Sequence, residues 1–162
     1  MNPVLIPDTG PIIALSGVNQ LDLLCRLYVR TLVPASVDKE VKGCIHNRLG
    51  LENYLRANWI EVVEPVEVEP LLRSELDAGE AAVISLALKE SHAKVLVDER
   101  KGRKIARLVY GLDVRGSVRV LIEAKKAGLI PNIQELIQQM RANGYRIHDS
   151  IVEYSLLVAG EK

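Results

Sequence analysis

The sequence predicts an α/β fold with a mainly parallel central sheet covered by helices, and three observations support this. The 162 residues suffice for one domain, and a domain of this size buries well over half of its unfolded surface. About 48% of the residues are hydrophobic, yet the chain has no Phe and one Trp, so Leu, Ile, Val and Ala must form the core. That mixture suits parallel strands, which are buried on both faces. Short apolar runs also alternate with helical patterns along the chain.

Five short apolar runs are the expected strands. The first is closed by the turn-forming residues Asp8-Thr9-Gly10. Each of the others stands between stretches with helical patterning or turn residues. The strands are expected at residues 4–7, 29–33, 59–63, 93–97 and 112–114.

Helices are expected between and after these strands. Pro11 suits the first turn of a helix, and the apolar spacing through Leu27 indicates one or two helical pieces. Asp77 is of a type that caps helices, and it begins the clearest helix of the chain. Strands separated by helices imply right-handed crossovers and a parallel sheet, in a single domain of residues 1–162. The remaining helices are expected from residues 34–36 through Val41, and at 49–58, 78–90, 99–110, 117–127, 133–142 and 148–158.

Composition argues against several classes of protein. Cys25 and Cys44 match no metal or redox spacing, and Cys44-x-His46 is a lone pair, so we expect reduced, partly buried thiols. The N-terminus lacks the basic and apolar regions of a signal peptide. No apolar run approaches the roughly 20 residues of a membrane span. We therefore expect a cytoplasmic protein with no membrane association.

Charge is balanced overall but segregated along the chain. The 21 basic and 21 acidic residues cancel, which is not the usual composition of a nucleic-acid-binding protein. Residues 61–80, however, carry seven acids and one Arg, whereas residues 100–126 carry nine Lys or Arg and two acids. Such segregation can position a polyanion beside an acidic, metal-binding centre.

Four carboxylates are expected to meet at one edge of the sheet. Asp8 follows the first strand, and Asp98 with Glu99 follows the fourth. Glu40 lies on the helix after the second strand, and Glu80 lies in the first turn of the helix that Asp77 begins. In open parallel sheets, ligands bind beyond the carboxyl ends of the strands. Crowded carboxylates require a cation, and their hard oxygens suit Mg²⁺ or Mn²⁺, which can activate water in phosphodiester cleavage.

Each acid also has a purely structural explanation. Asp8 could fix the turn before Pro11, and Glu80 could complete a capping box with Asp77. Asp98 could cap the helix that follows it. Glu40 could be an ordinary solvated acid. These explanations weaken when the acids are considered together, because all four reach the same predicted edge.

Other chemistries have less support. No Ser-His-Asp or Cys-His pairing and no glycine-rich phosphate loop is evident. A phosphotransferase with Asp8 as nucleophile lacks a second nearby acid as proton donor. A basic helical face could bind RNA phosphates near the metal or could be an ordinary solvated face. It consists of Arg100, Arg103, Lys104 and Arg107.

The order of these motifs resembles that of the PIN-domain family. The opening stretch Asp8-Thr9-Gly10-Pro11-Ile12-Ile13-Ala14-Leu15 is similar to the family motif that carries its first metal-binding Asp. Glu40, Glu80 and Asp98 match the second, third and fourth acids. The resemblance covers residues 4 to 158 and implies a three-layer α/β/α sandwich with RNA cleavage dependent on Mg²⁺ or Mn²⁺.

The second half of the chain resembles a VapC-toxin-like branch of that family. The similar residues are Val114-Arg115-Gly116-Ser117, Leu121, Ala124-Lys125-Lys126 and Gly128-Leu129-Ile130. This implies the toxin of a type II toxin–antitoxin pair, with an RNA substrate and a possible antitoxin partner. Two departures leave room for a catalytically weak or inactive module that binds RNA or protein. Glu80 stands where the family usually has Asp, and Val97-Asp98-Glu99 leaves open which acid is the ligand.

The C-terminal helix predicts a homodimer. Its apolar surface is broader than one core-facing stripe requires, and exposed apolar patches usually mark partner surfaces. Completion of the outer layer of the domain is the alternative. The apolar residues are Ile147, Ile151, Val152, Tyr154, Leu156, Leu157 and Val158.

Overall fold

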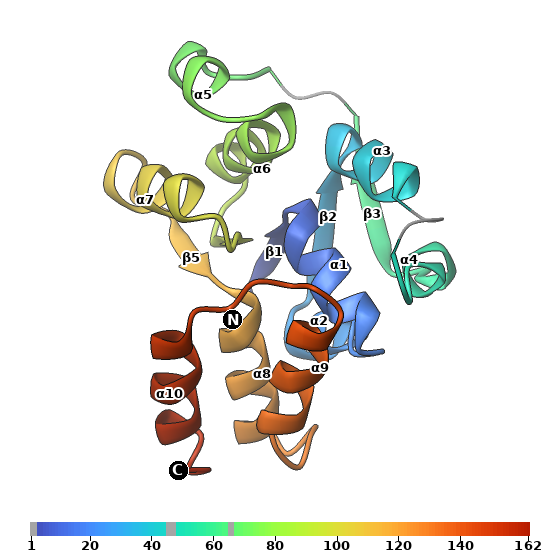
Figure 1. Ribbon diagram of the computed structural model, residues 1–162. Coiled ribbons are helices and arrows are strands. Elements are labelled where there is room, and N and C mark those ends of the chain that lie inside the picture. The colour runs from blue at the N-terminus through green and yellow to red at the C-terminus, as the bar shows by residue number, and fades with distance from the viewer. Residues whose placement is uncertain (1–2, 45–47, 65–66) are drawn as a thin grey trace.

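The computed structural model describes residues 3–44, 48–64 and 67–162, so His46 lies outside it. Five parallel strands form one sheet in the order β3-β2-β1-β4-β5, as Figure 1 shows. The all-parallel sheet confirms the predicted α/β class. The strands are β1 (Val4–Pro7), β2 (Arg30–Pro34), β3 (Ile60–Val63), β4 (Ala93–Leu96) and β5 (Asp113–Arg115).

The strand order places a topological switch point between β1 and β4. The chain moves outward from β1 through β2 to β3, then crosses to β4 on the other side of β1 and continues to β5. Pro7 pairs with Leu96 at the last rung, so the two strands end at the same level. Ligands of such sheets bind outside the carboxyl ends of the strands, where the order reverses.

Helices cover both faces of the sheet, as a three-layer sandwich requires. Right-handed crossovers place the helices that follow β1 and β2 on one face and those that precede β4 and β5 on the other. Figure 1 shows α6 and α7 on one side of the strands and α1, α2, α8 and α9 on the other. The helices are α1 (Thr9–Gly17), α2 (Leu23–Leu27), α3 (Ala35–Gly43), α4 (Glu52–Arg56), α5 (Pro70–Glu75), α6 (Ala78–Lys89), α7 (Arg100–Leu108), α8 (Ser117–Lys126), α9 (Gln134–Ala142) and α10 (Asp149–Val158).

The apolar stretch after Pro11 forms two helices, the larger of the two numbers expected, and Asn19 adopts a left-handed backbone (φ 57°) between them. One detail differs from the sequence-based expectation. The short helix α5 was not predicted, since Leu72 alone among its six residues is buried and a single anchor gives no periodicity.

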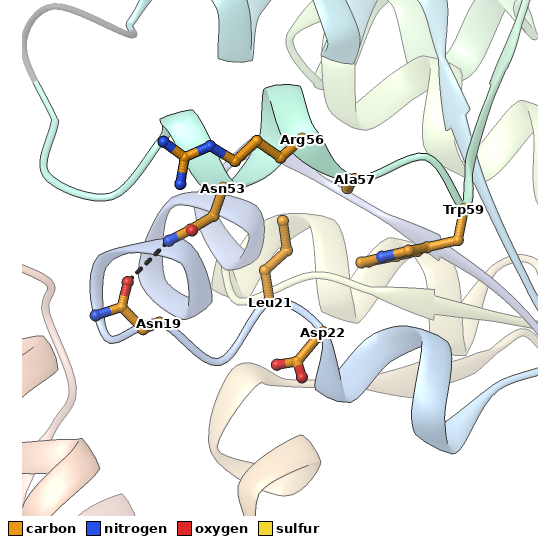
Figure 2. Close-up of a pocket in the computed structure, with 7 residues that line it drawn as sticks. All are labelled: Asn19, Leu21, Asp22, Asn53, Arg56, Ala57 and Trp59. Atoms are coloured by element: carbon orange, nitrogen blue, oxygen red, sulfur yellow. Dashed lines mark hydrogen bonds between the residues drawn. The ribbon is translucent and has the colours of Figure 1, made fainter.

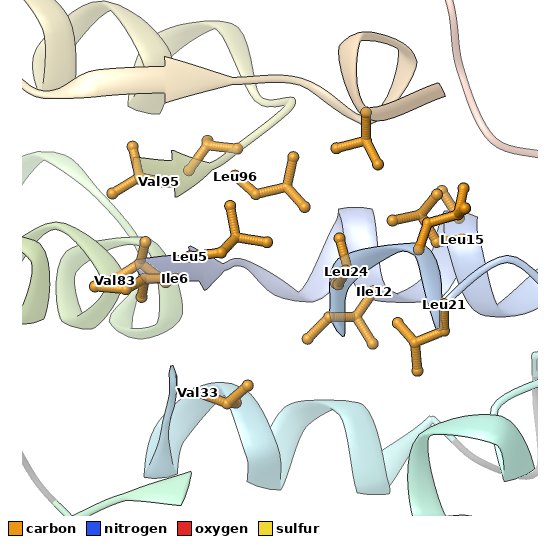
Figure 3. Packing of buried hydrophobic residues seen from close by; sticks show 14 of the residues in the cluster. Leu5, Ile6, Ile12, Leu15, Leu21, Leu24, Val33, Val83, Val95 and Leu96 are labelled. Carbon is orange, nitrogen blue, oxygen red and sulfur yellow. The ribbon is translucent and has the colours of Figure 1, made fainter. Parts of the chain in front are cut away.

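The core is aliphatic, as the composition predicts. Leu5, Ile6 and Val95 of the central strands are fully buried. Helix α6 packs against β1 and β4, and Figure 3 shows its Val83 beside Ile6. Both cysteines are free thiols, Cys25 exposed and Cys44 half-buried. Within the described ranges, no helix is long and apolar enough to cross a membrane.

Candidate metal-binding acidic site

Asp8 and Asp98 flank the switch point at the carboxyl edge of the sheet. Asp8 comes directly after β1, and its backbone N–H donates to the Leu96 carbonyl at 2.9 Å, which extends the pairing of β1 with β4 by one residue. Asp98 comes two residues after β4. The register of the two central strands therefore brings carboxylates 90 positions apart in the sequence to one edge.

Three carboxylates surround Gly79 in the first turn of α6. A Cβ placed on Gly79 would lie 3.1 Å from Glu40 Oε2, 3.4 Å from Asp8 Oδ1 and 3.5 Å from Asp77 Oδ1. Asp8 comes from the end of β1, Glu40 from α3 and Asp77 from the start of α6. The absence of a side chain at Gly79 leaves room for these oxygens. We call Asp8, Glu40 and Asp77 the Gly79 acid cluster.

Asp77 belongs to this cluster although the sequence reading gave it only a capping role. It does cap α6, since its carboxylate accepts a hydrogen bond from the Glu80 backbone N–H at 2.8 Å. Its Oδ1 also faces the space beside Gly79. The sequence contained a signal for this second role. Asp77 and Glu80 both stand at the N-terminus of α6, whose partial positive charge favours acids, so their carboxylates could be expected in the same region.

Burial and crowding change the acidity of Asp8. The side chain is 8% exposed, and loss of hydration raises its pKa from 3.8 to about 7. A hydrogen bond from the Thr9 backbone N–H acts in the opposite direction, while the negative charges of Asp77, Glu40 and Asp98 add to the rise. The ionised form of Asp8 is thus disfavoured unless a cation is present.

Glu80, in the first turn of α6, lies against α7. It is 9% exposed, and its Oε2 lies 3.6 Å from where a Cβ on Gly102 of α7 would be. Burial raises its pKa to about 7, and the charges of Asp77, Asp8 and Glu99 add to this effect. Glu80 is therefore a buried acid of the site rather than a solvated member of a capping box.

Asp98 is held by groups from two distant segments. Its Oδ1 accepts from the Ser117 backbone N–H at 2.8 Å, and its Oδ2 accepts from the hydroxyls of Ser117 and Tyr145. Burial and the negative charge of Asp98 raise the pKa of Tyr145, which keeps its hydroxyl protonated as a donor. The alternative that Asp98 caps the next helix is wrong, because its carboxylate accepts hydrogen bonds from the start of α8 and not from that of α7. Glu99 is exposed and makes no side-chain capping bond to α7.

The basic residues of helix α7 are of two kinds. Arg100, Lys104 and Arg107 are exposed, so they are available to a ligand. Arg103 is half-buried and donates to the Val97 carbonyl at 2.8 Å, which fixes the chain where it leaves β4. Its guanidinium also lies beside Asp98, which opposes the lowering of its pKa by burial. Arg103 thus has a structural role whether or not it also contacts RNA.

The donor chemistry of the site fits a hard divalent cation held by few protein ligands. Every candidate ligand is a carboxylate oxygen, the type that Mg²⁺ and Mn²⁺ prefer. In residues 3–44, 48–64 and 67–162, no three acidic, His or Cys side chains are arranged closely enough to enclose an ion as they stand. Mg²⁺ usually keeps several waters and binds through one or two carboxylates, so the Gly79 acid cluster suffices for that arrangement.

The fold agrees with the comparison to known families. A family model described as a PIN domain matches residues 4–161, which is nearly the whole chain. PIN domains are generally nucleases and typically use divalent metals, so the match supports a hydrolase that acts on nucleic acids. No curated protein matches the chain. On the extent of the family match and the all-parallel five-stranded sheet, the chain belongs to the PIN-domain family.

Proposed function

We propose that the protein is a Mg²⁺- or Mn²⁺-dependent endoribonuclease that cleaves RNA phosphodiester bonds. The observation that carries the proposal is the Gly79 acid cluster, which gathers carboxylates from β1, α3 and α6 at the sheet edge of a chain in a nuclease family. Asp8 and Glu40 or Asp77 would hold the cation. Glu80 and Asp98 would complete the acidic surroundings.

Each part of the site has a distinct task in this proposal. Asp8 with Glu40 or Asp77 would hold a divalent cation, which would supply water activation and charge neutralisation at the phosphodiester. Asp8 and Glu80, with pKa values near 7, bind protons in the metal-free protein and release them when the cation enters. Ser117 and Tyr145 hold Asp98 in one orientation. The exposed cations of α7 would bind RNA phosphates.

Cleavage of end-labelled single-stranded RNA tests this function. We expect cleavage in Mg²⁺ or Mn²⁺, none in a chelator, and none by the Asp8→Asn variant. Asp22→Asn is the matched control, because Asp22 is an exposed acid before α2, outside the site. An Asp8→Asn variant that still cleaves, or wild-type protein that never cleaves in either metal, contradicts the proposal.

A catalytically weak or inactive module is the second candidate, and one observation favours it. Both oxygens of Asp98 already accept hydrogen bonds, which leaves this acid less free to bind a cation than Asp8. Such a module would bind RNA or protein with no metal-dependent strand scission. RNA binding by the wild-type protein without cleavage in Mn²⁺ would favour this candidate.

We also propose that the nuclease is the toxin of a type II toxin–antitoxin pair, with an antitoxin as its partner. The support is the similarity of residues 114–130 to the VapC-like branch. Induced expression should then arrest bacterial growth, and Asp8→Asn should remove the arrest. A short adjacent gene for a DNA-binding protein that restores growth would identify the partner. Growth that continues in cells accumulating the active enzyme contradicts the toxin role.

A further inference from the structure

A groove of about 490 Å³ opens beside the acidic site. Its walls come from the end of β2 and from α3, α5 and α6, so it lies at the same carboxyl edge of the sheet as the acids. The floor is apolar, and two cations, Lys39 and Arg73, stand among its walls. We call it the α3–α6 groove, and its apolar lining includes Pro34, Val68, Leu76, Ala78, Ala81 and Ala82.

The same two helices line both the groove and the acid cluster. On α3, Ser36 and Lys39 face the groove, and Glu40 lies one turn beyond Ser36 in the acid cluster. At the start of α6, Ala78 faces the groove, and its two neighbours are Asp77 of the acid cluster and Gly79, which that cluster surrounds. An RNA strand with a phosphate at the acid cluster therefore has the groove directly beside it.

The charge of the groove is unbalanced. Both cations are exposed, and neither forms an ion pair with an acid of the described residues. Among the described residues, no acid lines the groove. A smaller hollow of 260 Å³ at the amino end of β3, drawn in Figure 2, differs in this respect, because Asp22 and Arg56 both line it. The α3–α6 groove is thus a positive, apolar-floored site next to a negative one.

We infer that the α3–α6 groove is the subsite for a nucleotide next to the scissile phosphate, an inference that rests on the proposed nuclease function. Lys39 and Arg73 bind the phosphate of that nucleotide, and they offset the repulsion that the acids exert on the RNA backbone. The base and ribose enter the apolar space, whose volume lies within the range of ligand pockets. Unpaired bases bind to apolar as well as aromatic side chains, so the substrate class is single-stranded RNA.

Equilibrium binding of a short labelled single-stranded RNA to the Asp8→Asn chain tests the subsite without cleavage. Lys39→Gln and Arg73→Gln should each weaken binding several-fold and lower the salt slope of log K by about 0.7 per lost phosphate contact. Arg56→Gln, in the hollow of Figure 2, is the matched control and should change neither quantity. A circular dichroism melt of each variant establishes that it is folded.

Filling the groove tests the base contact separately. Ala78→Leu and Ala82→Leu place a larger side chain in the groove, and each should weaken binding about tenfold at an unchanged salt slope. Ala142→Leu, an exposed alanine at the end of α9, is the control for added bulk. Three results would each overturn the inference. The groove variants could bind RNA as the controls do, the wild-type affinity could be too weak to measure, or an acidic peptide could compete as well as RNA. RNA binding through the groove by a protein that never cleaves would instead refute the nuclease proposal alone.

Discussion

Replacing Asp8 with Asn should stabilise the metal-free protein at neutral and alkaline pH. The folded chain raises the pKa of Asp8 from 3.8 to about 7, mainly by burial. An acid with a higher pKa in the folded than in the unfolded chain binds its proton more tightly when folded. Its contribution to stability is therefore complete below about pH 4 and is lost as the pH rises to about 7.

The size of the effect follows from the shift. Each unit of pKa corresponds to about 1.4 kcal/mol, so a rise of roughly three units gives an upper limit of ~4 kcal/mol for Asp8. Glu80 is raised in the same way, and the two acids influence each other, so their effects do not add in full. We expect Asp8→Asn to gain roughly 2–3 kcal/mol in free energy of unfolding at pH 8. The amide carries no charge to bury and retains a carbonyl that can accept from Thr9.

Urea unfolding in a chelator between pH 4.5 and 8.5 measures this difference. The stability of the wild type should fall across this range, while that of Asp8→Asn falls less. Acids whose pKa is lowered, such as Asp113 and Glu161, lose their contribution at lower pH and do not obscure the comparison. Mg²⁺ should stabilise the wild type more than the variant, because binding to the folded state adds to its stability. A variant no more stable than the wild type at pH 8 without metal refutes the reasoning.

Four further substitutions probe the rest of the site and the outer surface. Asp98→Asn should reduce the heat of Mn²⁺ binding in titration calorimetry, because it removes a negative charge beside the cation, and equal heat would show that Asp98 does not contribute to binding. Gly79→Ala should weaken Mn²⁺ binding without unfolding the protein, because its Cβ would lie 3.1 Å from an acid oxygen of the cluster. Tyr145→Phe should lower the free energy of unfolding by ~1–2 kcal/mol through loss of its bond to Asp98, whereas Tyr154→Phe, 68% exposed, should not. In light scattering at micromolar concentration, the wild-type chain should have the mass of a dimer. The Leu157→Glu variant, changed on the exposed apolar face of α10, should have the mass of a monomer. A wild-type monomer would contradict the predicted dimer.

The fold could be predicted because its signals are local. The strands are short apolar runs, and the start of α6 has a capping Asp77 whose bond the structure contains. The turn after β1 could be predicted equally well, since Asp is favoured in turns and Pro in the first turn of a helix. Helix α5 could not be predicted, because it depends on Leu72 reaching the core and on nothing periodic in its sequence.

The positions of the acids could be predicted better than their surroundings. Parallel strands end at one edge, so Asp8 and Asp98 could be assigned to the same region without knowledge of side chains. Ser117 and Tyr145 could not be connected to Asp98, because they lie 19 and 47 residues further along and meet it only through tertiary packing. Arg103 carries the same charge as its exposed neighbours on α7, and only the packing against Val97 distinguishes it.

The three hydrogen bonds on Asp98 determine when during synthesis the site can be completed. Asp8 and Glu40 emerge early, but Asp98 reaches its final setting only after Ser117 begins α8 and Tyr145 closes over it from the loop before α10. Domains fold as units during synthesis, and Tyr145, 47 residues after Asp98, supplies a group that holds this acid. A nascent or C-terminally truncated chain that ends before Tyr145 therefore has an unfinished centre. In a chain of a nuclease family, this coupling keeps the acidic edge incomplete until synthesis has passed Tyr145.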